Sequence, residues 1–417
     1  MRIVVLGAGL AGVSAVHALL RDGHQVQVLE RAAAAAAETS FANAGLVSPG
    51  HAFSWASPSA PMAMLRSLFK QDQALRVRSS LDPAFWRWGL SFLANCTQRR
   101  WVENSRRLVR LAKYSQQSLS EVVTQTGIDH AATRRGILYL YADQNALAAA
   151  RQQSELLLAE GVEVVALSTA EALDLEPQLA AWQERTAGAL YCPGDESGDA
   201  WRFTTGLAAW CAARGAEFNY GATIEALRAR GNRIVAVQTD RGEIAADAFV
   251  VSVGSHAPAL LRPLGYRVPI YPVRGNSVTF PIREGDRPPR IAGVDDGTLT
   301  AWSRLGERLR LTSTAEFSGY ANLLPAKDVE VLVARARAMF PNGADFDQAS
   351  PWSCLRPMTP TGTPIIGRTR HDNLYVHIGH GAMGWTTASG TAQMLADVVA
   401  GRNPVHPMAG LDAGLIL

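Results

Sequence analysis

The chain has 417 residues, of which 47% are hydrophobic and 18% charged, and its formal net charge is +3. This length can form two domains with a large core, the composition is typical of a soluble globular enzyme, and the charge is too small to indicate nucleic-acid binding. No uninterrupted apolar run approaches the roughly 20 residues that span a bilayer. The four cysteines are scattered without a C-x-x-C pair, so we expect neither a metal site nor a disulfide-exchange centre. The chain begins directly with an expected strand, which predicts no signal peptide and a cytoplasmic location.

The first thirty residues carry the most informative pattern. Residues 2–6 are expected to form a strand, residues 7–12 read Gly7-Ala8-Gly9-Leu10-Ala11-Gly12, and a helical stretch follows. Gly23 ends that stretch before a second apolar strand, which closes on Glu30 and Arg31. This order of strand, glycine turn, helix, strand and acid predicts a dinucleotide site, with an ordinary βαβ unit as the alternative.

Each part of this pattern has a mechanical use. Gly7 permits a sharp exit from the strand, Gly9 lets the backbone approach a pyrophosphate, and Gly12 allows close packing of helix and strand. The phosphates would lie at the positive N-terminus of the helix. A carboxylate at Glu30 would accept the ribose hydroxyls, which argues against NADP.

The next hundred residues are expected to be mainly helical. Residues 32–37 form a low-complexity loop, and residues 39–45 are small and polar, as suits a segment that passes beside a flat polar ring. A strand is expected at 136–141. Between Met62 and Lys113 eleven basic residues and six Phe or Trp residues accompany three acids, which indicates either a membrane-facing surface or a helical subdomain with a solvated basic face.

The rest of the chain returns twice to the nucleotide fold. Residues 247–254 form an apolar run that ends in Gly254, as a central parallel strand would. Residues 256–351 are rich in expected strands and Gly/Pro turns, which predicts an antiparallel sheet. The other expected strands are 216–220, 223–227, 232–238, 242–245 and 374–378, and a glycine-rich turn at 379–385 precedes a helix to about residue 400.

There is no second G-x-G-x-x-G motif. A single dinucleotide site assembled from distant segments favours FAD over NAD, because FAD proteins of this type enclose the whole cofactor.

Three motifs together resemble the bacterial D-amino-acid dehydrogenases, within the D-amino-acid oxidase and glycine oxidase group. They are Glu38-Thr39-Ser40-x-Ala42-Asn43-Ala44-Gly45-x-x-Ser48-Pro49-Gly50, Leu355-Arg356-Pro357-Met358-Thr359-Pro360-x-Gly362-Thr363-Pro364 and Gly379-His380-Gly381-x-x-Gly384-Trp385-Thr386. The resemblance covers almost the whole chain. It implies FAD-dependent oxidation of D-amino acids to 2-oxo acids and ammonia, with electrons passed to a quinone or another non-oxygen acceptor. It also implies attachment to the inner face of the bacterial inner membrane.

The resemblance assigns Arg356 to the substrate carboxylate, and the residue type suits that role because a planar guanidinium can bind a carboxylate with two hydrogen bonds. The alternative is a structural salt bridge. His51 and Tyr271 are further candidates for the substrate pocket, and Tyr271 could equally be a core residue.

We expect FAD to be held at the glycine turns and beside the ring. His380 either bonds the flavin or only caps its turn. The expected cofactor contacts are Gly7, Ala8, Gly9, Leu10, Ala11, Gly12, Glu30, Arg31, Ser40, Asn43, Ala44, Gly45, Leu46, Ile224, Gly254, Gly379, His380, Gly381, Met383, Gly384, Trp385 and Thr386.

Four positions depart from the family pattern: Arg274, Asn276 and the pair Thr312-Ser313. They leave the substrate side chain open, and so an oxidase or dehydrogenase of glycine, sarcosine or an imino acid such as D-hydroxyproline remains an alternative. A flavin domain for RNA modification or redox sensing is a third.

The expected fold class is α/β, with a discontinuous Rossmann-like FAD-binding domain and a substrate domain that contains a mainly antiparallel sheet and helices. The FAD-binding segments are 1–58, 151–256 and 351–417. The substrate-domain segments are 59–150, which is mainly helical, and 257–350, which carries the sheet.

Overall fold

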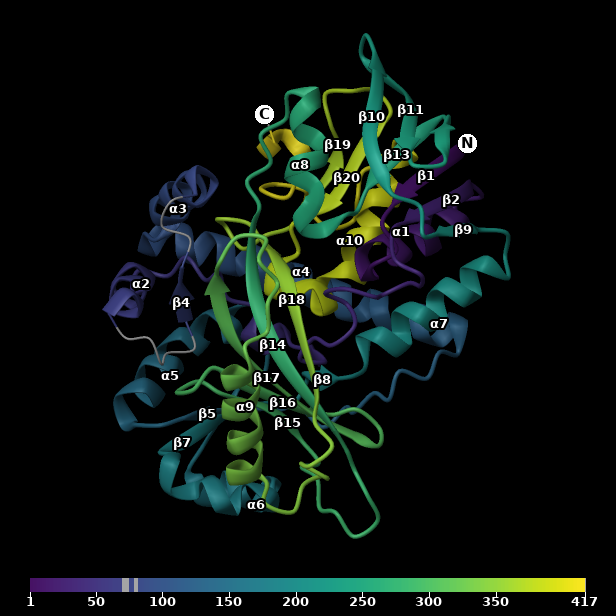
Figure 1. Ribbon diagram of the computed structural model, residues 1–417. Helices are drawn as coiled ribbons and strands as arrows, with labels where there is room; N and C mark the ends of the chain where they lie inside the picture. The colour runs from purple at the N-terminus through teal and green to yellow at the C-terminus, as the bar shows by residue number, and fades with distance from the viewer. Residues whose placement is uncertain (70–74, 79–81, 417) are drawn as a thin grey trace.

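The computed structural model describes residues 1–69, 75–78 and 82–416. Two large sheets lie at opposite ends of the molecule, and both chain termini lie at the end that holds the smaller sheet (Figure 1). This arrangement confirms the predicted α/β class.

The smaller sheet has six strands in the order β19-β20-β13-β1-β2-β9. Every adjacent pair is parallel except β19 with β20. The strand expected at residues 247–254 is β13. It lies at the centre of the sheet next to β1, where both faces of the sheet are covered. The strands are β1 (Arg2–Leu6), β2 (Gln25–Glu30), β9 (Glu217–Tyr220), β13 (Ala248–Val251), β19 (Ile365–Arg368) and β20 (Leu374–Ile378).

Helices cover one face of this sheet. α1 (Leu10–Arg21), α7 (Ala200–Ala212) and α10 (Gly384–Val399) share one apolar core with β1 and β2. The long helix α4 (Gln98–Thr126) packs against α10 where Gly390 meets Ser115, and a β-carbon on Gly390 would lie only 2.7 Å from the Cα atom of Ser115.

A three-stranded antiparallel sheet covers the other face, together with the short helix α8 (Ala257–Leu261). It consists of β10 (Ile224–Arg230), β11 (Arg233–Thr239) and β12 (Gly242–Ile244), which confirm the strands expected at 223–227, 232–238 and 242–245. Leu227, Ile234 and Val237 pack against Val4 and Phe249.

The larger sheet has nine strands in the order β18-β14-β17-β16-β15-β5-β7-β6, with β4 beside β17. Among the described residues it is mainly antiparallel, as predicted, and only the β15–β5 and β17–β4 pairs are parallel there. The strands are β4 (Leu75–Val77), β5 (Ile137–Tyr141), β6 (Val165–Leu167), β7 (Gly188–Cys192), β14 (Tyr271–Pro281), β15 (Ala292–Asp295), β16 (Thr300–Arg304), β17 (Arg308–Phe317) and β18 (Ser350–Met358).

Helix α9 (Ala326–Met339) packs on one face of this sheet (Figure 1), in a region where strands and turns are expected from the sequence. Its buried residues include Leu332, Ala336 and Met339, which are spaced by four and three residues as on an amphipathic helix. The surrounding strand-rich sequence obscured this short signal. The remaining helices are α2 (Ala60–Phe69), α3 (Pro83–Asn95), α5 (Gln144–Ala159) and α6 (Thr169–Leu175).

The strand pairing differs from one predicted domain boundary. β6 and β7 pair within the nine-stranded sheet, although residues 151–256 were assigned to the FAD-binding domain. The next strand along the chain, β8 (Glu196–Ser197), pairs with β3 (Leu46–Val47) in a separate two-stranded sheet. We therefore propose that the second FAD-binding segment begins near residue 198. In the described part of the chain, no helix is both long and apolar enough to cross a membrane.

Candidate active site

A cavity of about 1010 Å³ is lined by residues from both large sheets. Its volume lies at the upper end of the range for small-molecule and cofactor sites. The wall is formed by the first glycine turn, the end of β2, residues 37–51, the start of β10, and turns at 252–256 and 377–388. The nine-stranded sheet contributes residues from β14, β15, β16, β17 and β18.

The first glycine turn has the geometry that a pyrophosphate site needs. Gly7 has a φ of +102°, and a β-carbon on Gly12 would lie 2.0 Å from the carbonyl oxygen of Gly7. Gly7, Gly9, Leu10 and Ala11 line the cavity at the N-terminus of α1. Ala8 and Gly12 are not part of the cavity wall, and Gly12 instead allows the close approach of helix and strand.

Glu30 lines the cavity and also holds the glycine turn. Its carboxylate accepts hydrogen bonds from the amides of Ala8 at 2.7 Å and Ala32 at 2.8 Å. A carboxylate has about four lone-pair sites, so two remain for ribose hydroxyls. Arg31, beside it, forms an exposed ion pair with Glu38.

Ile224 and Gly254 lie on the cavity wall with Glu30 and Arg31. Ile224 begins β10, and Gly254 follows β13 with a φ of +52°. Three segments that are far apart in sequence therefore line one cavity.

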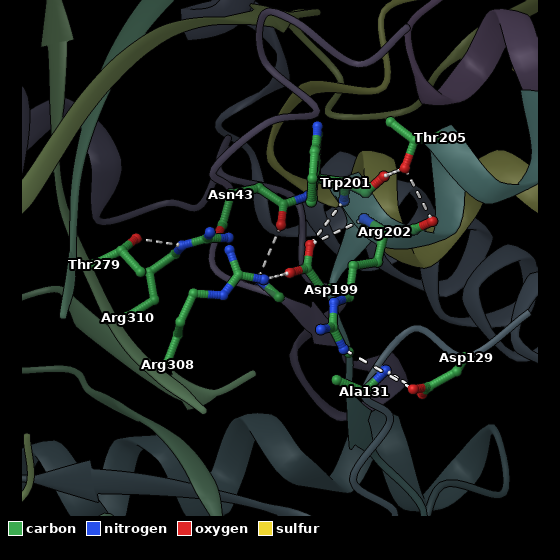
Figure 2. A network of polar contacts seen from close by, with 12 residues as sticks. Asn43, Asp129, Ala131, Asp199, Trp201, Arg202, Thr205, Thr279, Arg308 and Arg310 are labelled. Carbon is green, nitrogen blue, oxygen red and sulfur yellow. Dashed lines mark hydrogen bonds and ion pairs between the residues drawn. The ribbon is translucent and has the colours of Figure 1, made fainter. Parts of the chain in front are cut away.

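The segment 43–45 has each of its carbonyl groups bound by a different part of the protein, as Figure 2 shows in part. Arg310 Nη1 donates to the Asn43 carbonyl at 3.1 Å, and Ser303 Oγ donates to the Ala44 carbonyl at 2.8 Å. The Gly198 amide donates to the Gly45 carbonyl at 2.7 Å. Ser40, Asn43, Ala44, Gly45 and Leu46 all line the cavity.

The C-terminal glycine turn lies against the same space. Gly379 and Gly381 have φ values of +76° and +54°, and they line the cavity with His380, Met383, Gly384, Trp385 and Thr386. Trp385 Nε1 donates to the Gly198 carbonyl at 3.0 Å, and Thr386 Oγ1 accepts from the Ser48 amide at 3.2 Å. The start of α10 is thereby fixed to the segments beside it.

His380 is held by Thr391, whose hydroxyl also contacts His377. His377 Nδ1 lies 3.0 Å from the Ala11 carbonyl, which can only accept, so this nitrogen carries the proton. Burial lowers the pKa of both histidines, that of His380 to about 4, and both are neutral near pH 7. The Thr391 hydroxyl also donates to the Thr387 carbonyl at 2.8 Å, and it lies 2.7 Å from His377 Nε2 and 3.0 Å from His380 Nε2. Thr391 thus holds the His380 ring at the cavity wall.

Arg356 lies on β18 and lines the cavity. Its guanidinium passes over the Cα atom of Gly275, since a β-carbon on Gly275 would lie 2.3 Å from Nη2 and 2.4 Å from Cζ. Burial lowers the pKa of Arg356 from its ordinary value, but an arginine stays protonated in proteins. The sheet therefore presents a fixed positive charge to the cavity.

His51 lines the cavity and rests on a buried polar pair that the sequence analysis missed. Its ring stacks on Tyr139 at a centroid distance of 5.0 Å, and the Tyr139 hydroxyl donates to Asp195 at 2.7 Å. Asp195 also accepts from the Gly50 amide at 2.9 Å. Burial raises the pKa of Asp195 to about 7. The His51 side chain is exposed to the cavity, and partial desolvation there lowers its pKa from the ordinary value.

The structure places Tyr271 in the core, which was the alternative to a place in the substrate pocket. It is 2% exposed, packs with Phe85, Trp88 and Phe317, and is not part of the cavity wall. Its hydroxyl lies 3.1 Å from Asp82. Alternation along β14 explains the placement, because Tyr271 and Val273 share the face that packs against α3.

The family departures at 274 and 276 both contact Asp328 of helix α9. Arg274 forms ion pairs with Glu316 on β17 at 2.7 Å and with Asp328 at 3.7 Å, and Asn276, which also lines the cavity, donates from Nδ2 to Asp328 at 3.1 Å. The other two departures, Thr312 and Ser313, both line the cavity.

Comparison with known proteins places this geometry in a family. Residues 2–398 match the family described as FAD dependent oxidoreductase. A D-amino acid dehydrogenase of Rhizorhabdus wittichii is 44% identical over 404 residues, which are 97% of each chain. One of Cereibacter sphaeroides is 44% identical over 411 residues, which are 99% of this chain and 94% of the relative. This chain therefore belongs to the FAD-dependent oxidoreductases, and its cofactor is FAD.

Solved structures agree on the fold. Glycine oxidase from Geobacillus kaustophilus superposes with a TM-score of 0.75 at 24% identity and covers 99% of this chain and 98% of that chain. Iminodiacetate oxidase from Chelativorans sp. BNC1 superposes with a TM-score of 0.74 at 21% identity. The match covers 99% of this chain and 98% of the oxidase chain. At such identities the likeness concerns the fold alone.

The cavity fits FAD in several independent respects. Gly7, which has a positive φ, and Gly9 leave room for a phosphate chain at the N-terminus of α1, and Glu30 can receive the ribose. The segments 40–46 and 379–386 surround the space left for the ring. Bound FAD supplies the two-electron acceptor of this family, and Arg356 is placed to bind an anion nearby.

Proposed function

We propose that this protein is a D-amino-acid dehydrogenase, which oxidises D-amino acids to 2-oxo acids and ammonia. The observation that carries the proposal is the Arg356 guanidinium over Gly275, in the cavity that also holds the FAD-binding turns. The curated relatives at 42–44% identity bear the name of this activity.

Arg356 would bind the substrate carboxylate with two hydrogen bonds in one plane. The bound carboxylate would fix the orientation of the substrate Cα–H bond in the cavity, where bound FAD would supply the hydride acceptor. The cation of Arg356 belongs to the sheet, whose backbone hydrogen bonds hold it in register opposite Val273. Positioning of this kind can account for a large part of the rate acceleration.

The hydride leaves only after the substrate amine is neutral, so that nitrogen can donate its lone pair to the forming imine. His51, on the cavity wall, is itself neutral near pH 7 and can accept a hydrogen bond from the amine. Its stacking on Tyr139 fixes the plane of the ring. We assign His51 to substrate binding on this basis, and water hydrolyses the released imine to the 2-oxo acid and ammonia.

The electron acceptor belongs to the same proposal. We infer a quinone or another non-oxygen acceptor, as the resemblance to dehydrogenases implies. Oxygen uptake measured beside dye reduction separates this enzyme from an oxidase of glycine, sarcosine or an imino acid.

We further propose a peripheral location on the inner face of the bacterial inner membrane. On helices α2 and α3, Met62, Leu65, Trp86, Leu90 and Leu93 are exposed, and Trp86 and Leu90 are 56% and 67% exposed. The exposed Arg87, Arg99 and Arg100 lie on α3 and at the start of α4. Lys70 of the basic stretch lies outside the described residues. Exposed apolar and basic side chains together suit an anionic lipid surface.

The test of the proposed activity is anaerobic bleaching of the flavin by a panel of D-amino acids, glycine, sarcosine and D-hydroxyproline. Fast reduction by D-amino acids such as D-alanine, together with slow reduction by glycine and N-methyl amino acids, supports the proposal. Reduction by glycine or sarcosine alone contradicts it.

A further inference from the structure

The segment Asn43–Gly45 is held from the side of the nine-stranded sheet by two neighbouring strands. Ser303 on β16 and Arg310 on β17 lie opposite each other in the strand register. Their side chains donate to the carbonyl groups of Ala44 and Asn43, respectively. Two adjacent carbonyls of the loop therefore point toward the sheet.

A planar trans peptide places its carbonyl and its amide on opposite sides. Because the Asn43 carbonyl points to Arg310, the Ala44 amide of the same peptide plane points away from the sheet. Within the described part of the chain, the Ala44 amide donates to no other residue, whereas the Gly45 amide donates to Asn43 Oδ1 at 3.0 Å. Ala44 lines the cavity, and so its amide is a donor held ready for a ligand there.

Arg310 is a buried cation whose hydrogen-bond partners are neutral. It is 3% exposed, and Nε donates to Thr279 Oγ1 at 2.9 Å while Nη1 donates to the Asn43 carbonyl (Figure 2). Among the described residues, no carboxylate forms an ion pair with it. The neighbouring Arg308 instead forms an ion pair with Asp199, and Asp199 is the N-cap residue of α7. Burial lowers the pKa of Arg310 to about 10, so the group stays charged near pH 7.

We propose that Arg310 and Ser303 are positioning residues of the flavin site, which present the Ala44 amide to the polar edge of the isoalloxazine ring. The buried charge of Arg310 lies behind this amide and favours the reduced cofactor, because reduction adds negative charge to that edge. The inference rests on FAD binding in this cavity and does not depend on which substrate is oxidised.

The test uses the holoenzyme and two readouts that need no substrate. One is the flavin reduction potential, measured against a reference dye. The other is amide hydrogen exchange of residues 41–48. The variants are Arg310→Gln, Arg310→Lys and Ser303→Ala, and the matched control is Arg308→Gln, which lies two residues away on β17 and contacts Asp199 rather than the loop.

Arg310→Gln should change the reduced-to-oxidised ratio at a fixed poise by about tenfold toward the oxidised form, as expected for the loss of one charge-assisted interaction. It should also speed exchange in residues 41–48 by about tenfold. Arg310→Lys keeps the charge but cannot reach both acceptors in one plane, so exchange should accelerate while the potential stays close to that of the wild type. Ser303→Ala should behave like Arg310→Lys.

Arg308→Gln should leave both readouts unchanged, even if it lowers the melting temperature. An unchanged potential and unchanged exchange in Arg310→Gln with FAD bound would overturn the proposal. Equal changes in Arg308→Gln would also overturn it, because they would show a general loss of structure. If Arg310→Gln loses FAD, the test relies on Arg310→Lys and Ser303→Ala. Faster exchange of residues 41–48 in these two variants supports the proposal, and unchanged exchange in both contradicts it. Failure of D-amino acids to reduce the flavin would contradict the proposed activity while leaving this test intact.

Discussion

The guanidinium of Arg356 occupies the space that a side chain at Gly275 would fill. These residues lie on the adjacent strands β18 and β14, and a β-carbon on Gly275 would approach Arg356 Nη1 to 2.7 Å. The absence of a side chain at 275 thus lets the cation lie flat on the sheet and face the cavity. The position of Arg356 depends on a glycine that no sequence motif marks.

Gly275→Ala should therefore impair the binding of substrate without loss of FAD. The added methyl group meets the far end of a flexible side chain, so the guanidinium moves while the sheet stays intact. We expect kcat/KM to fall by about tenfold or more, equivalent to at least about 1.4 kcal/mol. Gly89→Ala, which has nothing within 4 Å of the new atom, serves as a control. Unchanged kinetics in Gly275→Ala would show that Arg356 tolerates a different position.

Arg356→Ala should have the larger effect. The loss of a buried pair with the substrate carboxylate costs on the order of 3–5 kcal/mol, or two to four decades in kcat/KM. Arg356→Lys should recover only part, because an ammonium group cannot form two coplanar bonds. Stopped-flow flavin reduction with D-alanine and its amide measures this. Wild-type rates in Arg356→Ala with FAD bound would assign the arginine a structural role.

Glu30 is expected to control FAD affinity through two routes, since it can bind the ribose and its carboxylate also accepts from the amides of Ala8 and Ala32. Glu30→Ala should weaken FAD binding by about 1.5–3 kcal/mol through loss of a charge-assisted hydrogen bond. Glu30→Gln keeps one acceptor oxygen, so its FAD affinity should lie between those of the wild type and Glu30→Ala. The dissociation constant of FAD, obtained from its release on dilution, checks the order. Equal affinities in all three proteins would remove Glu30 from the site.

Local spacing explains which parts of this site could be predicted from the sequence. Gly7, Gly9 and Glu30 stand in one βαβ unit, where each residue type has a mechanical reason. Arg310 and Ser303 meet Asn43 and Ala44 across about 260 residues, and only strand register brings them together. Whether Tyr271 lies in the pocket or in the core depends on which face of β14 packs against α3. Alternation along the strand shows which residues share a face, but it does not show which face is in the core.

The same limit applies to the fold. The central strands were found because both faces are apolar, as in β13. Helix α9 was missed because its few buried residues stand within a strand-rich region. The sheet that holds β6 and β7 is defined by pairing with distant β5, so no local pattern could place the domain boundary.

The exposed apolar residues of α3 should decide whether the protein binds membranes. We expect co-sedimentation with anionic vesicles at low salt, and weaker binding as salt rises through the physiological range, where charges are screened over about 8 Å. Trp86→Ser with Leu90→Ser should reduce binding. The control is Leu158→Ser, since Leu158 is an apolar residue on α5 with 53% exposure. Equal binding of both variants, or no binding at low salt, would contradict a membrane-facing α3.

Asp195 should make the stability of the protein depend on pH. Burial raises its pKa to about 7 from an ordinary value near 3.8, and the neighbouring Glu196 adds to the rise. Hydrogen bonds from Tyr139 and the Gly50 amide oppose it only in part. Because the folded-state pKa is raised, the folded protein favours the protonated carboxyl. Its stabilising contribution is fully present below about pH 4 and is lost as the pH rises through about 7.

Asp195→Asn removes this titration while its amide can still accept from the Gly50 amide and donate to the Tyr139 oxygen. We expect the wild type to lose up to about 4 kcal/mol of unfolding free energy relative to the variant between about pH 4 and about pH 8. Denaturant midpoints at several pH values, measured at constant FAD concentration, give this difference. Parallel pH profiles of the two proteins would show that Asp195 stays ionised in the fold. In that case the hydrogen bonds from Tyr139 and the Gly50 amide stabilise the carboxylate more strongly than burial destabilises it. The Tyr139–Asp195 pair beneath the His51 ring then carries a negative charge.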